Sequence, residues 1–574
     1  MRAAFTRLVL PALIGLIGVV AAAQSVRLPQ VVERTLDNGI KVLVVERPGI
    51  GVVQARIFIK GGRADTGGLP PAAADLLGRT LFRRVLPDRL EASLAPLLAQ
   101  EGGAFEALRL DRLAQARLPL GSASPGPASP DQASLQELEA NAKIALVQRM
   151  GELETWDALD ALGGTGRDVK VSADYLSYGI DLPAAALMPW CRIEAGRLRN
   201  QPLGRFPLER DRLLQEIEAG HPPSPAALAV LLATALSGRP YAQAAEFLPS
   251  EVQAITWRDL ATYAQWVVSP ENIRLVLVGD VKPAAVLPDL ERLFGTLPRA
   301  PGSEAHWEGA RAFQANDTVS SLESPGGRRL IVSTTGDTRI FFGWRIPSAN
   351  HPDGSALRAL VQILGGSPSA RLQQSLVDTR GIARNLTVRL GVPGRRDVNL
   401  LVIEAEPTEG HSLDELEQAI QDEILRLQRE PLAEPEVRQA QVQLEAGEIL
   451  VQEDAGTLAE ALGGALCQGG DWRLAFRALE ADGSLKASEI QRVARTYLVP
   501  PRVTIAQMGP DPLLLPMDRT ENRLLQVLTA LLGRKLGSPA QAQTVLREAL
   551  RQLRMLSPAE REQTLKLLES QVRP

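Results

Sequence analysis

The sequence predicts an α+β protein built from two homologous halves, because one order of strands and helices occurs twice along its 574 residues. Each half begins with two neighbouring stretches rich in β-branched residues, which are typical of strands. These stretches lie at residues 40–46 and 52–60, and again at 328–334 and 338–345. A helical region follows each pair, beginning near Pro70 in the first half and at Ser355 in the second.

Both halves also end alike, with a helix, a proline-containing stop and a strand closed by glycine. The helices are expected at residues 257–268 and 487–497, and the strands at 273–278 and 503–508. Gly279 and Gly509 are 230 positions apart, whereas Arg56 and Arg339 in the earlier strands are 283 apart. The first copy is therefore longer by about 53 residues. Two unrelated α+β domains are the alternative to a duplication.

The additional residues are expected as an insert near residues 119–162. Residues 121–134 are rich in Pro, Ser and Gly, as loops are, and residues 135–162 carry apolar side chains at helical spacing. A surface insert of this kind is tolerated because lengthening a loop adds little to the entropy cost of closing it.

The N-terminus predicts export. Arg2 and Arg7 precede an apolar stretch over residues 8–20, and three alanines then offer a small-residue cleavage site before Gln24. We expect a signal peptide over residues 1–23 and a periplasmic protein. A membrane anchor is the alternative, although the apolar stretch is shorter than the roughly 20 residues of a membrane span.

Charge and cysteine content bear on two further properties, nucleic-acid binding and disulfide bonding. The 63 Lys and Arg residues nearly balance the 67 Asp and Glu residues, so the net charge of −4 gives no strong field for binding nucleic acid. Cys191 and Cys467 are far apart in sequence and are expected as two buried thiols, with a disulfide as the alternative.

The chain thus divides into a signal peptide, an N-terminal half with its insert, a linker, a C-terminal half and a helical tail. The expected boundaries are 1–23, 27–298, 299–327, 328–512 and 513–574.

Several motifs, in order, resemble those of the pitrilysin/insulinase-type zinc metallopeptidases, the inverted zincins. Residues 35–42 (TLDNGIKV) resemble the opening strand motif of that family, and residues 269–280 resemble the end of its first domain. Residues 365–383, with Gly365-Gly366 and Arg380-Gly381-Ile382-Ala383, are similar to its C-terminal domain. The resemblance implies paired α+β sandwich domains in each half, with helices on one face of mixed or antiparallel sheets. It also implies that two such halves form a clam-shell chamber around an unfolded peptide.

The catalytic motif of the family is missing. Active members carry H-x-x-E-H on a helix, where two histidines on one face hold Zn²⁺ and the glutamate activates its bound water. The matching positions here are Asp75, Gly78 and Arg79, so all three groups are replaced. The chain has only 4 histidines, and no two of them lie close enough in sequence to form the motif. We therefore expect no catalytic residue, no metal ligand and no cofactor.

The family's downstream acidic helix is better kept. By resemblance, Glu216 stands at the third ligand position and Glu209 at the supporting acidic position two turns earlier, with a solvated acidic helix face as the alternative. A carboxylate that has lost its metal needs another cation. We predict an ion pair between Arg79 and Glu216, with Asp75 as a candidate third member.

A glycine pair marks the expected loop before a substrate-facing edge strand, which would bind peptide by strand addition. Gly163-Gly164 and Gly102-Gly103 are the two candidates, and the later pair fits better because residues 172–182 alternate in polarity. The residues after it, Arg167-Asp168-Val169, depart from the Asn-Ala stretch usual in the family.

These observations predict a non-catalytic subunit of a periplasmic zinc peptidase. It would shape a chamber, hold unfolded peptides and complete a related chain that keeps its metal site. A stand-alone peptide-binding or scaffold protein of the envelope is the first alternative. An active metallopeptidase with atypical ligands is the second.

Overall fold

The computed structural model describes residues 28–509 apart from eight internal gaps, together with parts of residues 520–572. The gaps are 84–87, 117–129, 151–154, 220–225, 245–247, 300–327 and 334–337, with a further gap at 478–484. The expected signal peptide and most of the expected linker lie outside the described residues. No helix among the described residues is long and apolar enough to cross a membrane.

The first half contains a six-stranded mixed sheet, called sheet A, in the order β1-β2-β6-β3-β5-β4. Its strands are β1 (Val32–Thr35), β2 (Lys41–Glu46), β3 (Val52–Lys60), β4 (Thr165–Val171), β5 (Tyr175–Pro183) and β6 (Ile273–Gly279). The central strand β6 is buried along its whole length, and apart from Arg274 it is an apolar run, as expected for a strand covered on both faces. Strand β4 forms one edge and follows Gly163-Gly164, as expected.

Helices cover one face of sheet A and bury its main core. They are α2 (Ala72–Arg83), α5 (Thr155–Ala161), α6 (Leu187–Asn200), α7 (Phe206–Glu218), α9 (Pro249–Ala254), α10 (Trp257–Val267) and α11 (Pro283–Phe294). Thr256 caps α10 by accepting a hydrogen bond from the backbone N–H of Asp259, which fixes where that helix begins. The fully buried Trp190 and Cys191 of α6 lie in this core.

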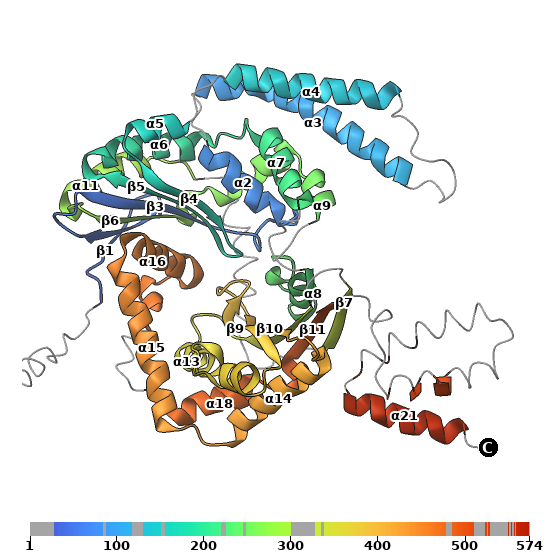
Figure 1. Ribbon diagram of the computed structural model, residues 1–574. Coiled ribbons are helices and arrows are strands. Elements are labelled where there is room, and N and C mark those ends of the chain that lie inside the picture. The colour runs from blue at the N-terminus through green and yellow to red at the C-terminus, as the bar shows by residue number, and fades with distance from the viewer. Residues whose placement is uncertain are drawn as a thin grey trace, which may run out of the picture.

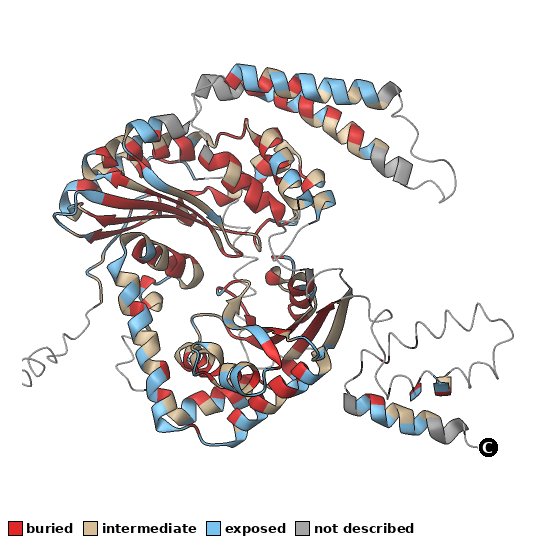
Figure 2. Ribbon diagram, in the orientation of Figure 1, coloured by how far each residue is buried: buried red, intermediate tan, exposed pale blue. Residues whose placement is uncertain are grey.

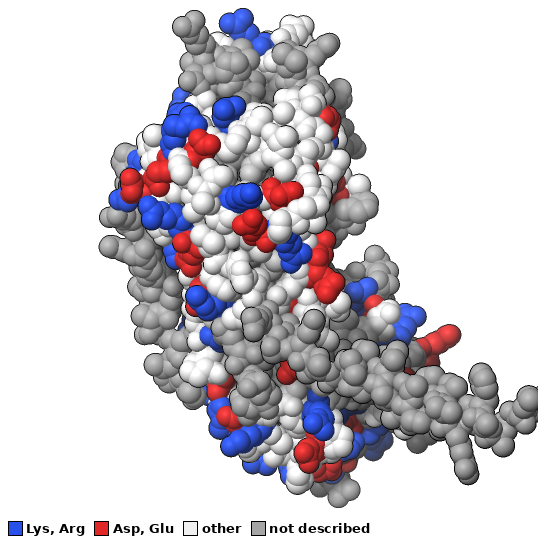
Figure 3. Space-filling model, turned by 90° about the vertical axis from the view of Figure 1, so that its left-hand side faces the viewer, with Lys and Arg blue, Asp and Glu red and all other residues white. Residues whose placement is uncertain are grey.

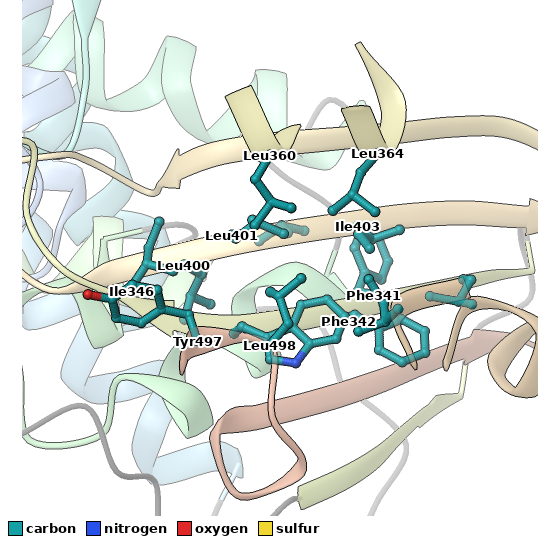
Figure 4. Close-up of a cluster of buried hydrophobic side chains, with 14 of the residues drawn as sticks. Phe341, Phe342, Ile346, Leu360, Leu364, Leu400, Leu401, Ile403, Tyr497 and Leu498 are labelled. Atoms are coloured by element: carbon teal, nitrogen blue, oxygen red, sulfur yellow. The ribbon is translucent and has the colours of Figure 1, made fainter. Parts of the chain in front are cut away.

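The second half repeats the plan with a five-stranded sheet, sheet B, in the order β7-β11-β8-β10-β9. Its strands are β7 (Arg328–Ser333), β8 (Arg339–Ile346), β9 (Ala383–Val392), β10 (Asn399–Pro407) and β11 (Val503–Gly509). Its helices are α13 (Gly354–Gly365), α14 (Leu413–Arg429), α15 (Glu434–Glu453), α16 (Ala455–Gly469) and α18 (Ala487–Tyr497). Figure 4 shows side chains from α13, β8 and β10 meeting in its core.

The expected α+β class with two homologous halves is confirmed. Within the described residues each half contains one sheet, so the paired α+β domains are the two halves themselves (Figure 1). Cys191 and Cys467 are both free and buried, as expected. Figure 3 shows charges of both signs interspersed on one side of the molecule.

The two halves exchange helices. Helix α8 (Ala226–Ala235) belongs to the first half in sequence but packs on β8 and β11 of sheet B, where Leu231 and Leu232 are fully buried. Helix α16 of the second half packs on β3 and β6 of sheet A, where Leu458 and Leu462 are fully buried. Each sheet therefore has one face covered by its own helices and the other by a helix of the opposite half (Figures 1 and 2).

These exchanged helices approach the sheets through glycine. A Cβ at Gly463 of α16 would lie 2.1 Å from the ring of Phe58 in β3. In sheet B the glycine is on the strand and the large side chain is on the helix. A Cβ at Gly343 of β8 would lie 2.9 Å from Leu231 of α8. A large side chain thus meets a glycine in both places.

Strand register refines the expected duplication. Strands β6 and β11 are 230 positions apart, as the sequence indicates. Ile57 of β3 pairs with Leu275 of β6, and Phe342 of β8 pairs with Ile505 of β11. The structural equivalent of Ile57 is therefore Phe342, so the expected match of Arg56 with Arg339 is wrong by two residues. A slip of two leaves each side chain on the same face, so the alternating pattern could not reveal it.

A polar cluster also ties the halves together. The guanidinium of Arg396, in the loop before β10, donates to Asp65 at 2.6 Å, and both side chains are buried. Tyr241 of the short helix η2 (Pro240–Gln243) donates to Asp174 and accepts from the backbone N–H of Arg396 at 2.8 Å. These buried contacts fix the loop between β3 and α2 against the second half.

The insert is a helical hairpin formed by α3 (Asp88–Ala116) and α4 (Pro130–Met150). It begins earlier than the expected insert near 119–162, and α4 starts inside the stretch expected as loop. Gly102-Gly103 lies within α3, so it precedes no strand. In the tail, α21 (Pro558–Val572) lies in the segment expected to be helical, and its buried Arg561 binds Asp414 of α14.

Two glycine substitutions test the helix exchange. We expect Gly463→Ala to lower the free energy of unfolding by about 1–3 kcal/mol, because the new methyl group overlaps Phe58. Gly447→Ala in α15 is the matched control, since a Cβ there meets nothing within 4 Å. It should instead stabilise by about 0.5–1 kcal/mol. Denaturant unfolding measures both, and equal effects of the two substitutions would contradict the packing.

Candidate functional site: a metal position filled by ion pairs

Helix α2 carries the three degenerate positions and lies between sheet A and α7. It begins after Pro70 and Pro71, and its alanine-rich first turn is fully buried. Asp75 lies one turn before Gly78 and Arg79, and these two neighbours point in different directions: Gly78 faces the sheet while Arg79 reaches α7.

The general-base position has no room for an acidic side chain. A Cβ at Gly78 would lie 3.1 Å from Val171 Cγ2 of β4 and 3.3 Å from Leu176 Cδ2 of β5. Val169 Cγ1 would lie at 3.4 Å. These distances are already tight for one carbon atom, so apolar side chains occupy the space that a catalytic glutamate and its water would need.

The predicted ion pair between Arg79 and Glu216 is confirmed. Its two hydrogen bonds run side by side, Nη1 to Oε1 at 2.9 Å and Nη2 to Oε2 at 2.6 Å. The hydrogen bonds that Arg79 donates to Glu216 raise the pKa of Arg79 above its ordinary value. The side chains are 26% and 43% exposed, so solvent screens the pair and its net contribution is roughly 0.2–1 kcal/mol. Its chief effect is to neutralise Glu216 in a fixed geometry.

Asp75 does not join that pair, contrary to the expectation. It accepts two hydrogen bonds from Arg63, Nε to Oδ2 and Nη2 to Oδ1, both at 2.8 Å. Arg63 lies in the loop after β3. Its backbone N–H donates a hydrogen bond to the carbonyl of Ser172 at 3.0 Å. Two separate Arg–carboxylate pairs therefore stand at the positions that the resemblance assigns to a single metal centre.

Glu209 lies in the first turn of α7 and is fully buried. Arg205 Nε lies 3.6 Å from its Oε1, and Arg212 Nη1 lies 3.4 Å from the same atom. Burial raises the pKa of Glu209 to about 7, while the charges of Arg205 and Arg79 oppose the rise. The burial of Glu209 is unlike a solvated acidic helix face, and its role as the supporting position stays a prediction.

The residues present do not fit a zinc ion. Zinc in this setting needs two imidazoles and a carboxylate, and the described residues contain no cluster of three or more His, Cys, Asp or Glu. Each carboxylate that could serve as a ligand is already held by a guanidinium, and a second positive charge there would be repelled. No hydrolytic step through a metal can be written for this geometry.

Three residues that contact the degenerate positions, Arg63, Val169 and Val171, escaped the sequence analysis. Arg63 is 12 residues before Asp75, and no helical spacing links them, although its place in a loop leading into α2 was a usable signal. The apolar side chains of Val169 and Val171 could be assigned to the metal position only once the pairing of β4 was known.

The opposite face of β4 is charged. Asp168 lies 3.1 Å from Arg56 of β3 and 3.2 Å from Lys170, and Glu460 of α16 lies 2.7 Å from Arg56. Tyr175 donates to Glu460 at 3.0 Å. The edge strand thus has an apolar side toward α2 and a charged side toward the second half.

The comparisons with known proteins find similarity to M16 peptidases. Residues 254–444 match the family model described as the peptidase M16 inactive domain. An uncharacterized zinc protease of Mycobacterium leprae is 24% identical over 305 residues, which cover 53% of this chain and 66% of that protein.

Solved structures show the same fold. A protease from Helicobacter pylori superposes with a TM-score of 0.62 at 19% identity, covering 84% of this chain and 100% of that one. A peptidase M16 inactive domain from Pseudomonas fluorescens gives a TM-score of 0.61 at 16% identity, covering 85% and 100%.

The fold and the site define a peptidase-like α+β protein in which ion pairs and apolar side chains stand at the metal position. The resemblance drawn from the motifs is confirmed: the chain is similar to the pitrilysin/insulinase-type, or M16, peptidases, its residues 254–444 match their inactive domain, and it shares their fold.

Restoring the motif tests whether the metal position still exists. We expect the triple variant Asp75→His, Gly78→Glu, Arg79→His to unfold at a lower temperature than the wild type. The glutamate would overlap Val171, and Arg63 would lose its carboxylate. We also expect no stoichiometric zinc by elemental analysis. One tightly bound zinc with peptide hydrolysis would show that the ancestral site is intact.

Glu209 predicts a pH dependence of stability. Because its pKa is raised to about 7, the folded state holds a proton that the unfolded state releases near pH 4.5. On account of this group, stability falls as pH rises from about 4.5 to 7 and then levels off. Glu209→Gln should therefore gain stability relative to the wild type between pH 5 and pH 8, measured by denaturant unfolding. A difference that is constant across this range would contradict the raised pKa.

Proposed function

We propose that this protein is the non-catalytic subunit of a zinc peptidase, shaping a peptide-binding chamber around a related, metal-bearing chain. The observation that carries the proposal is the ion pair at α2, which stands where the resemblance places a metal ligand. The bidentate Arg79–Glu216 pair joins α2 to α7 where the family would use zinc, so the walls keep their positions while the hydrolytic groups are gone.

The joining of the two halves supports a structural role. Helices α8 and α16 each pack on the opposite half, and Asp65 binds Arg396 in a buried contact. A chain braced in this way presents a stiff surface to a partner. In this proposal it acts as one shell of a clam-shell chamber, and the metal-bearing chain acts as the other.

Strand β4 is the proposed contact for unfolded peptides. It is an edge strand, and a peptide adding to it would gain main-chain hydrogen bonds without sequence preference. The adjoining charges of Arg56, Asp168 and Lys170 would favour peptides that carry both signs of charge. Peptide binding at this edge would not require a second protein chain. A stand-alone peptide-binding role is therefore the second candidate.

The cellular site follows from the expected signal peptide at residues 1–23, which predicts export to the periplasm. That location is part of the proposal. It can be checked by whether the first residue of the mature protein is Gln24.

Reconstitution tests the proposal. The tagged chain is purified from its native envelope, and co-eluting proteins are searched for a relative with an intact H-x-x-E-H motif. We expect hydrolysis of an unfolded peptide to rise about tenfold or more when the two chains are mixed, with this chain alone inactive.

Matched substitutions identify the subunit that performs the chemistry. Changing the motif glutamate of the partner to glutamine should abolish hydrolysis, whereas Glu216→Gln here should leave the rate within about twofold. Peptide binding without any co-eluting relative would favour the stand-alone role. Hydrolysis by this chain alone would contradict both.

A further inference from the structure

The α3–α4 hairpin and the body enclose a cavity that the peptidase-like fold does not account for. The hairpin lies between α2 and β4, where residues 84–164 intervene, whereas only residues 366–382 separate the corresponding elements α13 and β9. In Figure 1 the hairpin projects beyond the helices that cover sheet A. The cavity is therefore specific to the first half.

The hairpin is docked on the body, so the cavity has defined walls. Two apolar side chains from each of its helices are buried together, namely Leu94, Leu98, Leu146 and Met150. Arg210 of α7 binds Glu101 of α3 at 2.5 Å, and neither side chain is exposed. A buried charge pair of this kind holds α3 and α7 in one register, because sliding would leave both charges unpaired.

The cavity has a volume of about 240 Å³ and receives side chains from α3, α4, α7 and α9. Leu108 and Leu214 form apolar parts of its walls, on α3 and α7. Three carboxylates also line it, those of Glu139, Asp211 and Glu218. Because drug-sized ligands occupy cavities of roughly 300–1,000 Å³, the occupant of this one is a small molecule.

The side chain of Lys143 shows how these walls hold an ammonium group. Its Nζ lies 2.6 Å from Glu139 and 2.5 Å from Asp211. Behind it lies the fully buried Glu101, whose Oε1 is 4.0 Å from the same nitrogen. The second oxygen of Glu101, Oε2, accepts no hydrogen bond among the described residues. An unused buried acceptor therefore adjoins the cavity.

The lining has an excess of negative charge. Arg109 is neutralised by Glu106, to which it donates two hydrogen bonds at 2.7 and 2.6 Å. Lys143 is then the one remaining cation against the three lining carboxylates, which leaves a net charge of −2. Within the described part of the chain, nothing donates a hydrogen bond to Glu218. This balance favours a ligand with two positive charges.

The spacing along α7 indicates how those two charges are arranged. Asp211 and Glu218 are two turns apart and so lie about 10 Å apart along the helix axis, with Leu214 between them on the same face. A negative group thus stands at each end of an apolar stretch. This pattern is complementary to a short aliphatic chain that carries an ammonium group at each end.

A divalent metal ion fits the cavity less well. The described residues contain no cluster of three or more His, Cys, Asp or Glu that could hold one. Metal–oxygen bonds are about 2.0–2.6 Å long, so a single ion cannot contact carboxylates that a leucine separates.

We propose that this cavity binds a linear aliphatic diamine. One ammonium group is held by Asp211 and Glu139, and the other by Glu218. The methylene chain between them packs on Leu108 and Leu214. This binding is independent of the proposed role as a peptidase subunit, since the hairpin lies outside the duplicated fold.

Calorimetric titration of the full chain tests the ligand class. We expect saturable binding of putrescine and cadaverine at one site per chain. n-Butylamine should bind at least about tenfold more weakly, because it can make the charged hydrogen bonds of only one end. Equal binding of n-butylamine, or displacement of the diamine by an equal concentration of Mg²⁺, would indicate unspecific attraction and overturn the proposal. A tenfold preference for lysine amide over cadaverine would assign the cavity to a peptide N-terminus and also contradict it.

Matched substitutions place the binding in the cavity. Glu218→Gln should weaken the binding of cadaverine about tenfold, because an amide cannot pair with an ammonium charge. Glu137→Gln is the control, since it removes the same charge from an exposed position on α4 outside the cavity, and it should leave the affinity unchanged. Both side chains are exposed, so neither variant should change the thermal unfolding temperature without diamine. Equal affinities of Glu218→Gln and the wild type would overturn the proposal, as would equal losses in the two variants.

Discussion

The contact between Arg79 and Glu216 is the one on which the interpretation of the site depends. In active relatives a metal ion would join the helix of the H-x-x-E-H motif to the helix of the third ligand. Here a guanidinium makes the same connection between α2 and α7 with two parallel hydrogen bonds. Exposure to solvent keeps its net energy small. The pair matters because it supplies the positive charge that Glu216 would otherwise lack, and because it leaves no open coordination position.

The position of α2 is determined mostly by packing. Gly78 lets the helix lie directly on β4 and β5, and Arg63 holds Asp75 from the preceding loop. The same loop contains Asp65, which binds Arg396 of the second half. The geometry around α2 therefore depends on both halves, including the exchanged helices that hold the two sheets together. A small adjustment in one half cannot reopen the site without disturbing these buried contacts.

Much of the fold could be predicted because its signals are local. The strands β2, β3, β6 and β11 have β-branched runs bounded by turns, and α10 and α18 have amphipathic spacing with proline stops. The Arg79–Glu216 pair could also be predicted, because the resemblance placed both residues at ligand positions and electrostatics required a cation. The absence of a complete motif was plain from the histidine count.

Other features could not be predicted because they depend on long-range packing. Nothing in the sequence of α8 or α16 indicates that each covers the sheet of the other half, since a buried helix is apolar wherever it lies. The partner of Asp75 depended on the path of a loop, and the two-residue register shift of β8 preserves its alternating pattern. The hairpin was only partly recognised, because α3 has apolar residues on several sides and the stretch before α4 resembles a loop.

Zinc content is the most direct measurement of the central claim. The purified wild-type protein and its Glu216→Ala variant are equilibrated with equimolar zinc, passed over a desalting column and analysed for metal. We expect well under about 0.1 zinc per chain in both, because Arg79 occupies the carboxylate and no imidazole is present. About one zinc per wild-type chain, lost in Glu216→Ala, would contradict the conclusion that ion pairs have replaced the metal.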